Sequence, residues 1–503
     1  MTAVLAAAAG EFVRPTIDFH AFAPEIVLVG ALVVVLMVDL FANEENKWLL
    51  PSLAGLGVLG ALVPVLTLAL DGQDRILFDG AYVVDDFALV MKALFLVAAY
   101  VVIQLSTNEI AEGDYHEGEY YVLLLASVLG MTVMASARDL ISIFVALELL
   151  SIPAYMLAAW RKRELKGHEA GLKYYLMGVF ASAIMLYGMS LLYGVTGSTR
   201  LADIGQTLSS SPDSQPVITM AIVFVLIGFA FKVSAVPFHT WAPDTYEGAP
   251  TPITAYLAVA SKAAGFVAII NLVFVAFLGR DDVVEPLMWV LAALTMTVGN
   301  LIALRQTNVV RMLAYSSVAQ AGFMIAPLAV YGDAGEDALT ALVSYLIIYG
   351  AMNLGAFAVV IAVARKTGSG EIESFGGLFE YAPGLTVAMT VFLFSLAGIP
   401  PLAGWVAKFV VFRSLLAAET VSGVVLAVIV AVNSVIALYY YANVARQMWM
   451  QPVADDDRTP IKVPFSLVSA LVITTVATIA IGVYPEMVTR FGDLANELAA
   501  VAP

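Results

Sequence analysis

Long apolar runs of about 20 residues recur along the whole chain and are separated by short polar connections. Such a run is long enough to cross the hydrocarbon core of a bilayer as one α-helix. The pattern predicts about fourteen spans, at 23–42, 48–70, 84–106, 118–137, 140–160, 170–194, 217–240, 252–278, 285–304, 309–331, 338–364, 385–416, 420–447 and 463–484. Because no connection between them is long enough to fold by itself, we expect an all-α polytopic protein with a single membrane domain, 1–503.

Composition supports a membrane protein and excludes several functions. Hydrophobic residues make up 61% of the chain and charged residues only 13%, against about 25% in soluble domains. The net charge of −16 argues against nucleic-acid binding, which needs a basic surface. The chain has no cysteine, so it can form no disulfide and hold no iron–sulfur cluster through cysteine. It also has no glycine-rich phosphate loop, so we expect it to bind no cofactor or metal and to carry no electrons.

Basic residues in the connections indicate how the chain is oriented. Arg161, Lys162, Arg163 and Lys166 follow the fifth span, Arg305 and Arg311 bracket the ninth connection, and Arg365 and Lys366 follow the eleventh span. These connections fall on one side of the membrane, and the positive-inside rule makes that side cytoplasmic. Both termini are then expected on the non-cytoplasmic side. The first residues have no basic region before their short apolar run and are not expected to be a cleaved signal peptide.

Several ionisable residues lie inside the predicted spans. A charge at the centre of a bilayer costs about 3 kcal/mol on insertion scales, so such residues are expected to face polar partners or water. The simplest interpretation is that they line one internal path, although a lysine can also snorkel to the interface or form a structural ion pair. These two alternatives stay open above all for Lys92, which is close to Asp85 and Asp86, and for Lys173. The residues are Lys92, Glu148, Lys173, Lys232, Lys262 and Lys408.

A buried lysine can change protonation near neutral pH when its carboxylate partner moves or becomes neutral. Such behaviour is what a proton relay requires. We therefore interpret Glu148 and Lys232 as a coupled switch, with Lys262 passing the proton on and Lys408 exchanging it with one aqueous side.

Prolines interrupt two of the spans. The seventh holds Lys232 and Pro237, and the twelfth reads "SLAGIPPLAGWVAKF". Proline removes a backbone donor, and in a membrane the freed groups are tolerated only where protein or water meets them. Two broken spans five apart indicate two inverted five-helix repeats, at about 118–278 and 285–447, flanked by helices at 23–106 and 463–484. The alternative is that these prolines are ordinary kinks.

The segment "FKVSAVPFHTWAPDTYEGAPTPITAYLAVASKAAGF" (231–266) strongly resembles the antiporter-like membrane subunits of respiratory complex I. The segments "LELLSIPAYML" (147–157), "RMLAYSSVAQAGFM" (311–324) and "SLAGIPPLAGWVAKF" (395–409) support it, and the likeness covers nearly the whole chain. Two features resemble the N-type branch of this family. They are the lysine at position 408 and the end of the chain soon after its last span.

The resemblance implies roles for matching positions. Glu148 and Lys232 would form the ion pair, Lys262 the central relay and Lys408 the exit-side group, while Lys173 matches the sixth-span lysine and His239 a histidine near the seventh-span break. It implies a bacterial plasma-membrane complex whose other membrane and peripheral subunits carry NAD, FMN, iron–sulfur clusters and quinone. The chain would translocate protons within that NADH:quinone oxidoreductase. The alternatives are a subunit of a multi-subunit sodium/proton antiporter and a passive structural membrane subunit.

Overall fold

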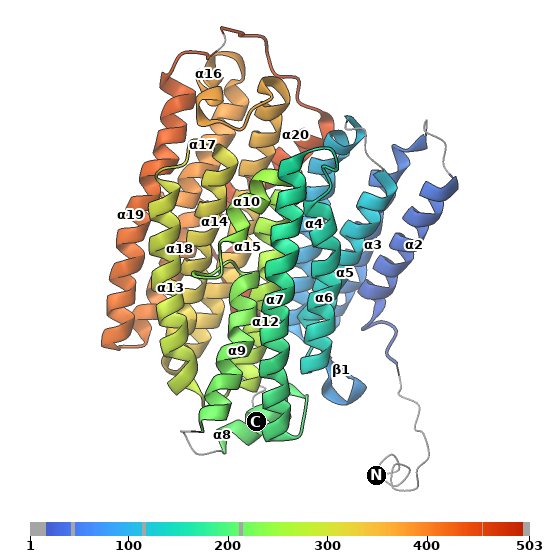
Figure 1. Ribbon diagram of the computed structural model, residues 1–503, viewed down its shortest axis with the longest axis vertical. Coiled ribbons are helices and arrows are strands. Elements are labelled where there is room, and N and C mark those ends of the chain that lie inside the picture. Colours follow the sequence, from blue (N-terminus) through green and yellow to red (C-terminus); the bar gives the residue numbers. More distant parts are fainter. Residues whose placement is uncertain (1–16, 42–45, 113–116, 211–214, 455, 496–503) are drawn as a thin grey trace.

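Long helices standing nearly side by side make up most of the chain, as Figure 1 shows for the computed structural model, which describes residues 17–41, 46–112, 117–210, 215–454 and 456–495. The longer helices are α2 (Ala23–Phe41), α3 (Leu49–Asp71), α4 (Asp86–Glu112), α5 (Glu117–Ser136), α6 (Leu140–Ala158), α7 (Leu165–Thr196), α9 (Pro216–Lys232), α12 (Lys262–Asn271), α13 (Asp281–Ala303), α14 (Val309–Ile325), α15 (Tyr331–Thr367), α17 (Pro383–Ala397), α18 (Ala403–Ala417), α19 (Val421–Met450) and α20 (Phe465–Val483).

Short elements connect or flank these helices. They are the strands β1 (Arg75–Leu77) and β2 (Tyr82–Val84), the helices α8 (Leu201–Ser209), α10 (Trp241–Gly248), α11 (Thr251–Tyr256), α16 (Leu378–Tyr381) and α21 (Glu486–Ala495), the 3-10 turns η2 (Phe78–Gly80), η5 (Ala326–Val330) and η6 (Ile372–Phe375), and the π-helical segments η3 (Leu257–Ser261) and η4 (Leu272–Ala276).

Eleven helical runs among the described residues are long and apolar enough to cross a membrane. One of them, Val309–Thr367, holds both α14 and α15. The backbone N–H of Val309 donates to the carbonyl of Gly370 at 2.8 Å, so α14 begins where α15 ends and the two helices run antiparallel. The helices α9 and α17 are apolar but shorter. The predicted all-helical membrane architecture is therefore confirmed at the level of eleven candidate spans.

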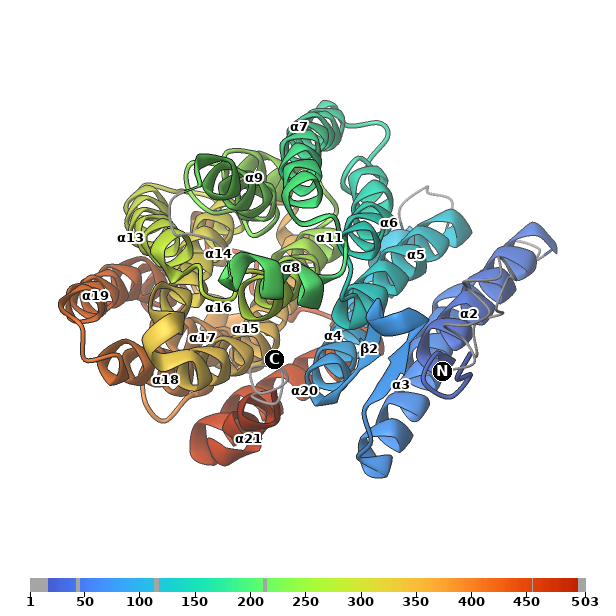
Figure 2. The same cartoon turned by 90° about the horizontal axis from the view of Figure 1, so that it is seen from below.

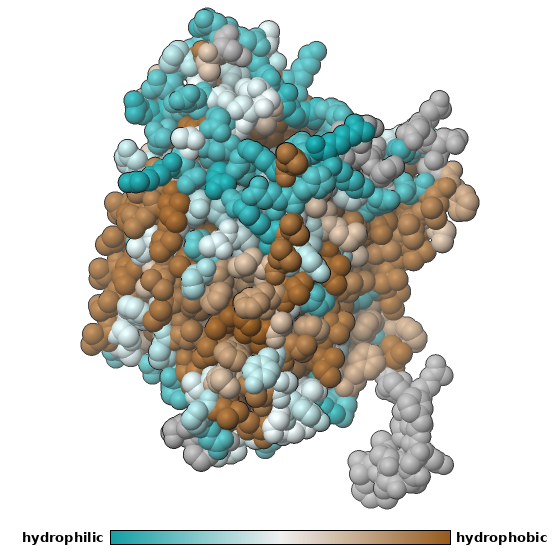
Figure 3. All heavy atoms as spheres, viewed as in Figure 1, coloured by the Kyte–Doolittle hydropathy of each residue, from teal (hydrophilic) through white to brown (hydrophobic). Residues whose placement is uncertain are grey.

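The surface fits a bilayer. On the face shown in Figure 3, an apolar belt crosses the middle of the molecule, with a broad hydrophilic cap at the upper end and hydrophilic residues at the lower end. Seen from below, α2 and α3 stand at one edge of the bundle, and α18 and α19 stand at the opposite edge (Figure 2). In the run Thr251–Ala276, 94% of the apolar stretch is buried, against 22% in α2, so this run belongs to the protein's interior.

Two helices stop partway through the bundle, at the places where the sequence predicted interruptions. The helix α9 ends at Lys232 and the chain becomes helical again at Trp241, while α17 ends at Ala397 and α18 begins at Ala403. The second break is tight: a Cβ on Gly404 would lie 1.7 Å from the carbonyl oxygen of Ser395. Glycine is therefore required for the first turn of α18 to lie against the end of α17.

The short elements were not predicted. The strands β1 and β2 form an antiparallel hairpin between α3 and α4 at the lower end of the bundle. The helix α21 follows the last span, and η3 immediately precedes Lys262. Single π-helical turns are rare and are often found at functional sites.

Candidate functional site

Three lysines lie inside the bundle, each on a different helix. Lys232 is the last residue of α9, Lys262 is the first residue of α12, and Lys408 lies in α18. Their exposed fractions are 3%, 1% and 4%. An ammonium group buried to this degree needs hydrogen-bond acceptors, because the cost of removing it from water is otherwise uncompensated.

Lys232 finds its acceptors on two neighbouring helices. Its Nζ donates to Oγ of Ser151 at 2.9 Å and to the hydroxyl of Tyr174 at 3.1 Å. The ring of Tyr174 stacks on Trp241 with centroids 4.4 Å apart, so the break after α9 places an aromatic wall beside the amine. Trp241 in turn donates from Nε1 to the carbonyl of Phe231 at 3.1 Å, near the end of α9.

Glu148 lies one turn before Ser151 on α6, which places it on the side of that helix that faces Lys232. The carboxylate is partly buried and accepts a hydrogen bond from Ser182 at 2.6 Å. Its charge acts on Lys232, but in the described structure the hydrogen bonds of the lysine go to Ser151 and Tyr174. Glu148 and Lys232 are therefore neighbours, and α6 carries both Glu148 and Ser151, which accepts a hydrogen bond from Lys232.

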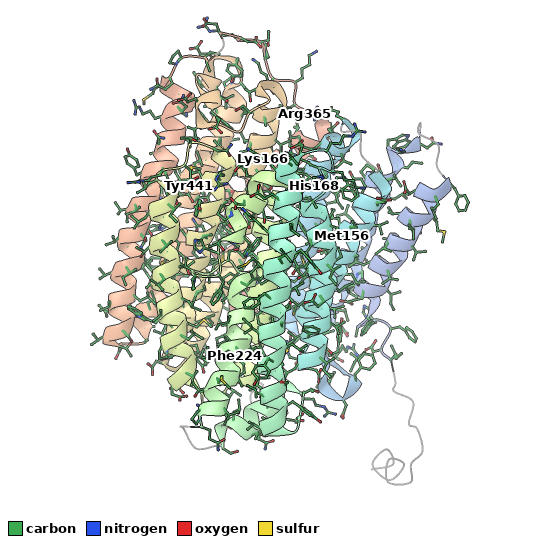
Figure 4. All side chains as sticks on the ribbon, viewed as in Figure 1. Met156, Lys166, His168, Phe224, Arg365 and Tyr441 are labelled. Carbon is green, nitrogen blue, oxygen red and sulfur yellow. The ribbon has the colours of Figure 1, made fainter. Side chains whose placement is uncertain are left out.

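Lys262 is held by α14. Its Nζ donates to the carbonyl oxygen of Ser317 at 2.8 Å and to Oγ of the same residue at 2.5 Å. One turn further along α14, Gln320 donates from Nε2 to the carbonyl of Leu396 at 3.1 Å and to the hydroxyl of Tyr441 at 3.3 Å. Tyr441, labelled in Figure 4, comes from α19.

Lys408 completes the line of polar groups. Its Nζ donates to the carbonyl of Ala397, the last residue of α17, at 2.7 Å and lies 4.9 Å from the centre of the Phe323 ring. Ala397 follows Leu396, to which Gln320 donates, so Lys262 and Lys408 are bridged by polar groups of α14 and α17. We call the set Glu148, Ser151, Tyr174, Lys232, Lys262, Ser317, Gln320 and Lys408 the central seam.

Some buried polar atoms in the first break, on α10 and on α15 form no hydrogen bond of good geometry with described residues. They are Nδ1 of His239, the hydroxyls of Tyr246 and Tyr349, and both amide atoms of Asn353. Buried polar groups are generally satisfied by protein or by ordered water, so these atoms indicate places suited to water. His239 lies in the segment between α9 and α10, with its ring 6.5 Å from that of Tyr315.

Lys173 belongs to a different group of charges, near the upper end of α7. Its side chain is 44% exposed, and its Nζ lies 2.5 Å from Asp244 and 2.6 Å from Glu169. Arg311 of α14 bonds Asp244 at 3.0 Å and Glu247 at 2.7 Å. Figure 4 labels Lys166, another member, beside His168 at this end of the bundle. This upper ion network joins α7, α10 and α14. The described contacts of Lys173 belong to this network and not to the central seam, and its role in proton transfer stays a prediction.

Lys92 is fully buried, and its partner is not the aspartate pair next to it in sequence. Its Nζ lies 3.0 Å from Oε1 of Glu25 and donates to the hydroxyl of Tyr82 at 2.9 Å. Asp85 pairs instead with Arg138, at 2.7 Å. Glu25 was not singled out from the sequence, because it stands in the first turn of α2, where an acidic residue is ordinary.

No group of three or more histidine, aspartate or glutamate side chains that could hold a metal ion occurs within the described ranges. The described side chains therefore provide hydrogen-bond donors and acceptors and titratable groups.

Comparison with known proteins identifies the family. Residues 137–436 match the transmembrane family described as NADH:quinone oxidoreductase/Mrp antiporter. The chain is 39% identical to NADH-quinone oxidoreductase subunit N of Trichlorobacter lovleyi, over 96% of this chain and 98% of that one. It is 42% identical to the subunit N of Heliobacterium modesticaldum, over 89% and 90% of the two chains. The chain belongs to the NADH-quinone oxidoreductase subunit N family.

Solved structures share the fold of this chain. A chain of respiratory complex I from Thermus thermophilus superimposes with a TM-score of 0.76 and 31% identity, covering 93% of this chain and 98% of that one. A chain of the Mrp complex from a Dietzia species gives a TM-score of 0.84 at 20% identity, covering 96% and 98%, which shows a shared fold. The predicted resemblance to the antiporter-like subunits of complex I, in its N-type branch, is confirmed.

Proposed function

We propose that this subunit N chain translocates protons across the bacterial plasma membrane, as part of the membrane arm of an NADH:quinone oxidoreductase. Other membrane and peripheral subunits of that complex would bind NAD, FMN, iron–sulfur clusters and quinone. This chain would contribute the path for protons and no redox group of its own.

The observation that carries the proposal is the central seam. Three lysines on three helices lie buried, and each is bonded to a neutral oxygen of a neighbouring helix. Intramembrane ionisable groups are expensive and typically mark ion or proton pathways. A purely structural role would be served better by a tightly paired opposite charge on each lysine, which the described contacts of Lys262 and Lys408 do not include.

Neighbouring polar groups within each part of the seam support proton transfer. Ser151 and Glu148 are one turn apart, as are Ser317 and Gln320, so each helix offers two polar groups on one face. We infer that protons pass from Glu148 and Lys232 to Lys262, and then past Ser317 and Gln320 to Lys408. The unpartnered atoms near the break, among them Nδ1 of His239, favour water along this route.

Repeated helix ends support two inverted repeats. Asp139 caps α6 by accepting from the N–H groups of two following residues, and Asn308 caps α14 in the same way. The sequence Thr-Gly-Ser ends both α7 and α15: Thr196 and Thr367 each donate back to the helix, and Gly197 and Gly368 adopt the left-handed conformation. These matches pair α6 with α14 and α7 with α15. With the two broken helices counted as one crossing each, we count fourteen crossings.

The orientation follows from the distribution of basic residues. Lys166 and Arg365 lie at the upper end of the bundle in Figure 4, and the other basic connections occur at the same end. The positive-inside rule makes that end cytoplasmic. Because α2 begins and α20 ends at the lower end, both termini are proposed to be non-cytoplasmic.

Alanine substitutions in the assembled complex test the proposal. Purified complex carrying Lys232→Ala, Lys262→Ala or Lys408→Ala is reconstituted into vesicles, and NADH-driven proton uptake is followed with a pH-sensitive dye. Each variant is expected to lose most of its uptake, whereas Lys462→Ala, at an exposed position outside the helices, is expected to behave as the unmodified protein. If all three seam variants pump normally, the chain is a structural subunit.

A sodium/proton antiporter subunit is the second candidate, favoured by the shared fold of the Mrp chain. It predicts a different set of partners. Gentle detergent purification that recovers flavin and iron–sulfur subunits supports the oxidoreductase, and recovery of membrane subunits alone, with sodium-dependent proton exchange, supports the antiporter.

A further inference from the structure

A second group of buried ionisable side chains lies outside the central seam, where α2, β2, α4 and α5 meet toward the lower end of the bundle (Figure 1). Glu25 and Lys92 have exposed fractions of 3% and 0%. Nζ of Lys92 lies 3.0 Å from Oε1 of Glu25 and donates to the hydroxyl of Tyr82 at 2.9 Å. The seam as described above uses none of these residues.

Tyr82 connects this pair to further polar groups. Its hydroxyl is close to both Glu25 and Ser136, the last residue of α5. Asn271 of α12 donates from Nδ2 to the carbonyl of Ala137, the residue after Ser136, at 3.3 Å. We call Glu25, Tyr82, Lys92, Ser136 and Asn271 the lower cluster.

The acceptors of the lower cluster are only partly used. Both carboxylate oxygens of Glu25, Oγ of Ser136 and Oδ1 of Asn271 are buried and form no hydrogen bond of good geometry with described residues. A buried pair that served only to hold helices together would be expected to have its remaining lone pairs satisfied by protein groups. These atoms are instead suited to accepting hydrogen bonds from small molecules such as water, and the carboxylate of Glu25 can also accept a proton.

Charged residues lie between the lower cluster and the lower end of the bundle. Asp85 stands seven residues before Lys92 and is therefore on the same side of α4, about 10 Å nearer the end of the helix. It pairs with Arg138 at 2.7 Å. Asp86 and Asp74 lie close to Asp85, and both are more exposed than it is. Exposed carboxylates at this end of α4 attract protons from the adjacent water.

We propose that Glu25, Lys92 and Tyr82 form a second proton-exchange site, which releases protons to water on the side of the membrane where α2 begins. The second site extends the proposed function, and it depends on that function only for the source of its protons. In the transfer, Lys92 gives a proton to the phenol oxygen of Tyr82 while the phenol gives its own proton to Glu25. The ammonium–carboxylate pair thereby becomes an amine and a carboxylic acid. The acid then loses its proton to water near Asp85, and Lys92 accepts the next one.

Removing the phenol oxygen is the sharpest test, because it keeps the ring and its packing. In Tyr82→Phe the ring still stacks on Phe22, whose centroid lies 4.6 Å away. NADH-driven proton uptake by the reconstituted complex is expected to fall at least ~10-fold. This factor is smaller than the rate factor that a positioned proton-transfer group typically contributes. The matched control is Tyr331→Phe, since Tyr331 is also buried and donates one hydrogen bond, to the carbonyl of Phe277. This control is expected to pump normally.

A double substitution separates proton exchange from a structural ion pair. Replacing a buried pair by apolar residues of similar size often leaves stability unchanged. Glu25→Leu combined with Lys92→Leu is therefore expected to assemble to normal levels, measured by NADH oxidation with an artificial electron acceptor, and still to lose proton uptake. If Tyr82→Phe assembles poorly, Glu25→Gln, which keeps the shape of the side chain, takes its place.

Lys232→Ala, measured in parallel, keeps the two proposals distinguishable. Normal uptake in both Tyr82→Phe and the double variant, with uptake lost in Lys232→Ala, overturns the second site and leaves the central seam standing. Normal uptake in Lys232→Ala counts against the seam, whatever the Tyr82 variant does. Loss of uptake in Tyr82→Phe with normal assembly supports the second site.

Discussion

Ser317 is the residue through which α14 holds the ammonium group of Lys262, and replacing it by alanine tests that contact directly. The hydroxyl lies 2.5 Å from Nζ, and the carbonyl oxygen of the same residue, 2.8 Å away, remains in the variant. A hydrogen bond to a charged group contributes about 1.5–3 kcal/mol. At 1.4 kcal/mol for each factor of ten, its loss makes charged Lys262 about 10- to 150-fold less populated relative to the neutral form. If protons pass through the charged form, proton uptake slows by up to the same factor.

The assay is NADH-driven proton uptake into vesicles that contain the purified complex, with NADH oxidation by an artificial acceptor as the measure of assembly. Ser414→Ala is the matched control, because Ser414 is also fully buried and its hydroxyl bonds the carbonyl of Val411 within α18, at 2.9 Å. The control is expected to keep its uptake. An unchanged rate in Ser317→Ala with normal assembly would refute the inference that protons pass through charged Lys262.

Three further substitutions test the fold. Gly404→Ala is expected to abolish assembly, since its Cβ would lie 1.7 Å from the carbonyl oxygen of Ser395, whereas Gly384→Ala, with no atom within 4 Å, is expected to be tolerated; the amount of intact complex on a native gel distinguishes them. Asp139→Ala removes the cap of α6 and is expected to cost about 0.5–2 kcal/mol, seen as a lower thermal midpoint, with Asp139→Asn as the control that keeps a capping oxygen. Burial and the nearby aspartates raise the pKa of Asp74, so the folded chain binds its proton more tightly than the unfolded chain and loses stability as the pH rises. Asp74→Asn is therefore expected to raise the thermal midpoint at neutral pH, and an equal gain in acid, where the aspartate is already protonated, contradicts this explanation.

The sequence predicted features that depend on local pattern. Apolar runs indicated the spans, prolines indicated where α9 and α17 end, and the scarcity of charge drew attention to Lys232, Lys262 and Lys408. Each of these signals is contained within about 20 residues, the length of one span.

Features that depend on contacts between distant segments could not be predicted. Lys92 pairs with Glu25, 67 positions earlier, instead of with the aspartates beside it. Lys173 lies in the upper ion network because α10, after the break, brings Asp244 to it. The acceptors of Lys262 belong to α14, 55 positions later in the chain. A single sequence shows which groups are costly to bury, whereas packing decides which partner each of them finds.

In the two repeats that we propose, the helix ends match, whereas the side chains between those ends differ. Asp139 and Asn308 perform the same task, as do the two Thr-Gly-Ser segments. Counted from these two caps, the acidic Glu148 of the first proposed repeat corresponds to the neutral Ser317 of the second, which accepts the hydrogen bonds of Lys262. Terminating a helix is a backbone requirement that both copies of a duplicated unit must satisfy, while interior side chains are free to diverge. Two repeats of similar backbone can thus carry different side chains in their interiors. This chemical difference between the halves can give proton transfer a direction that the backbone alone does not.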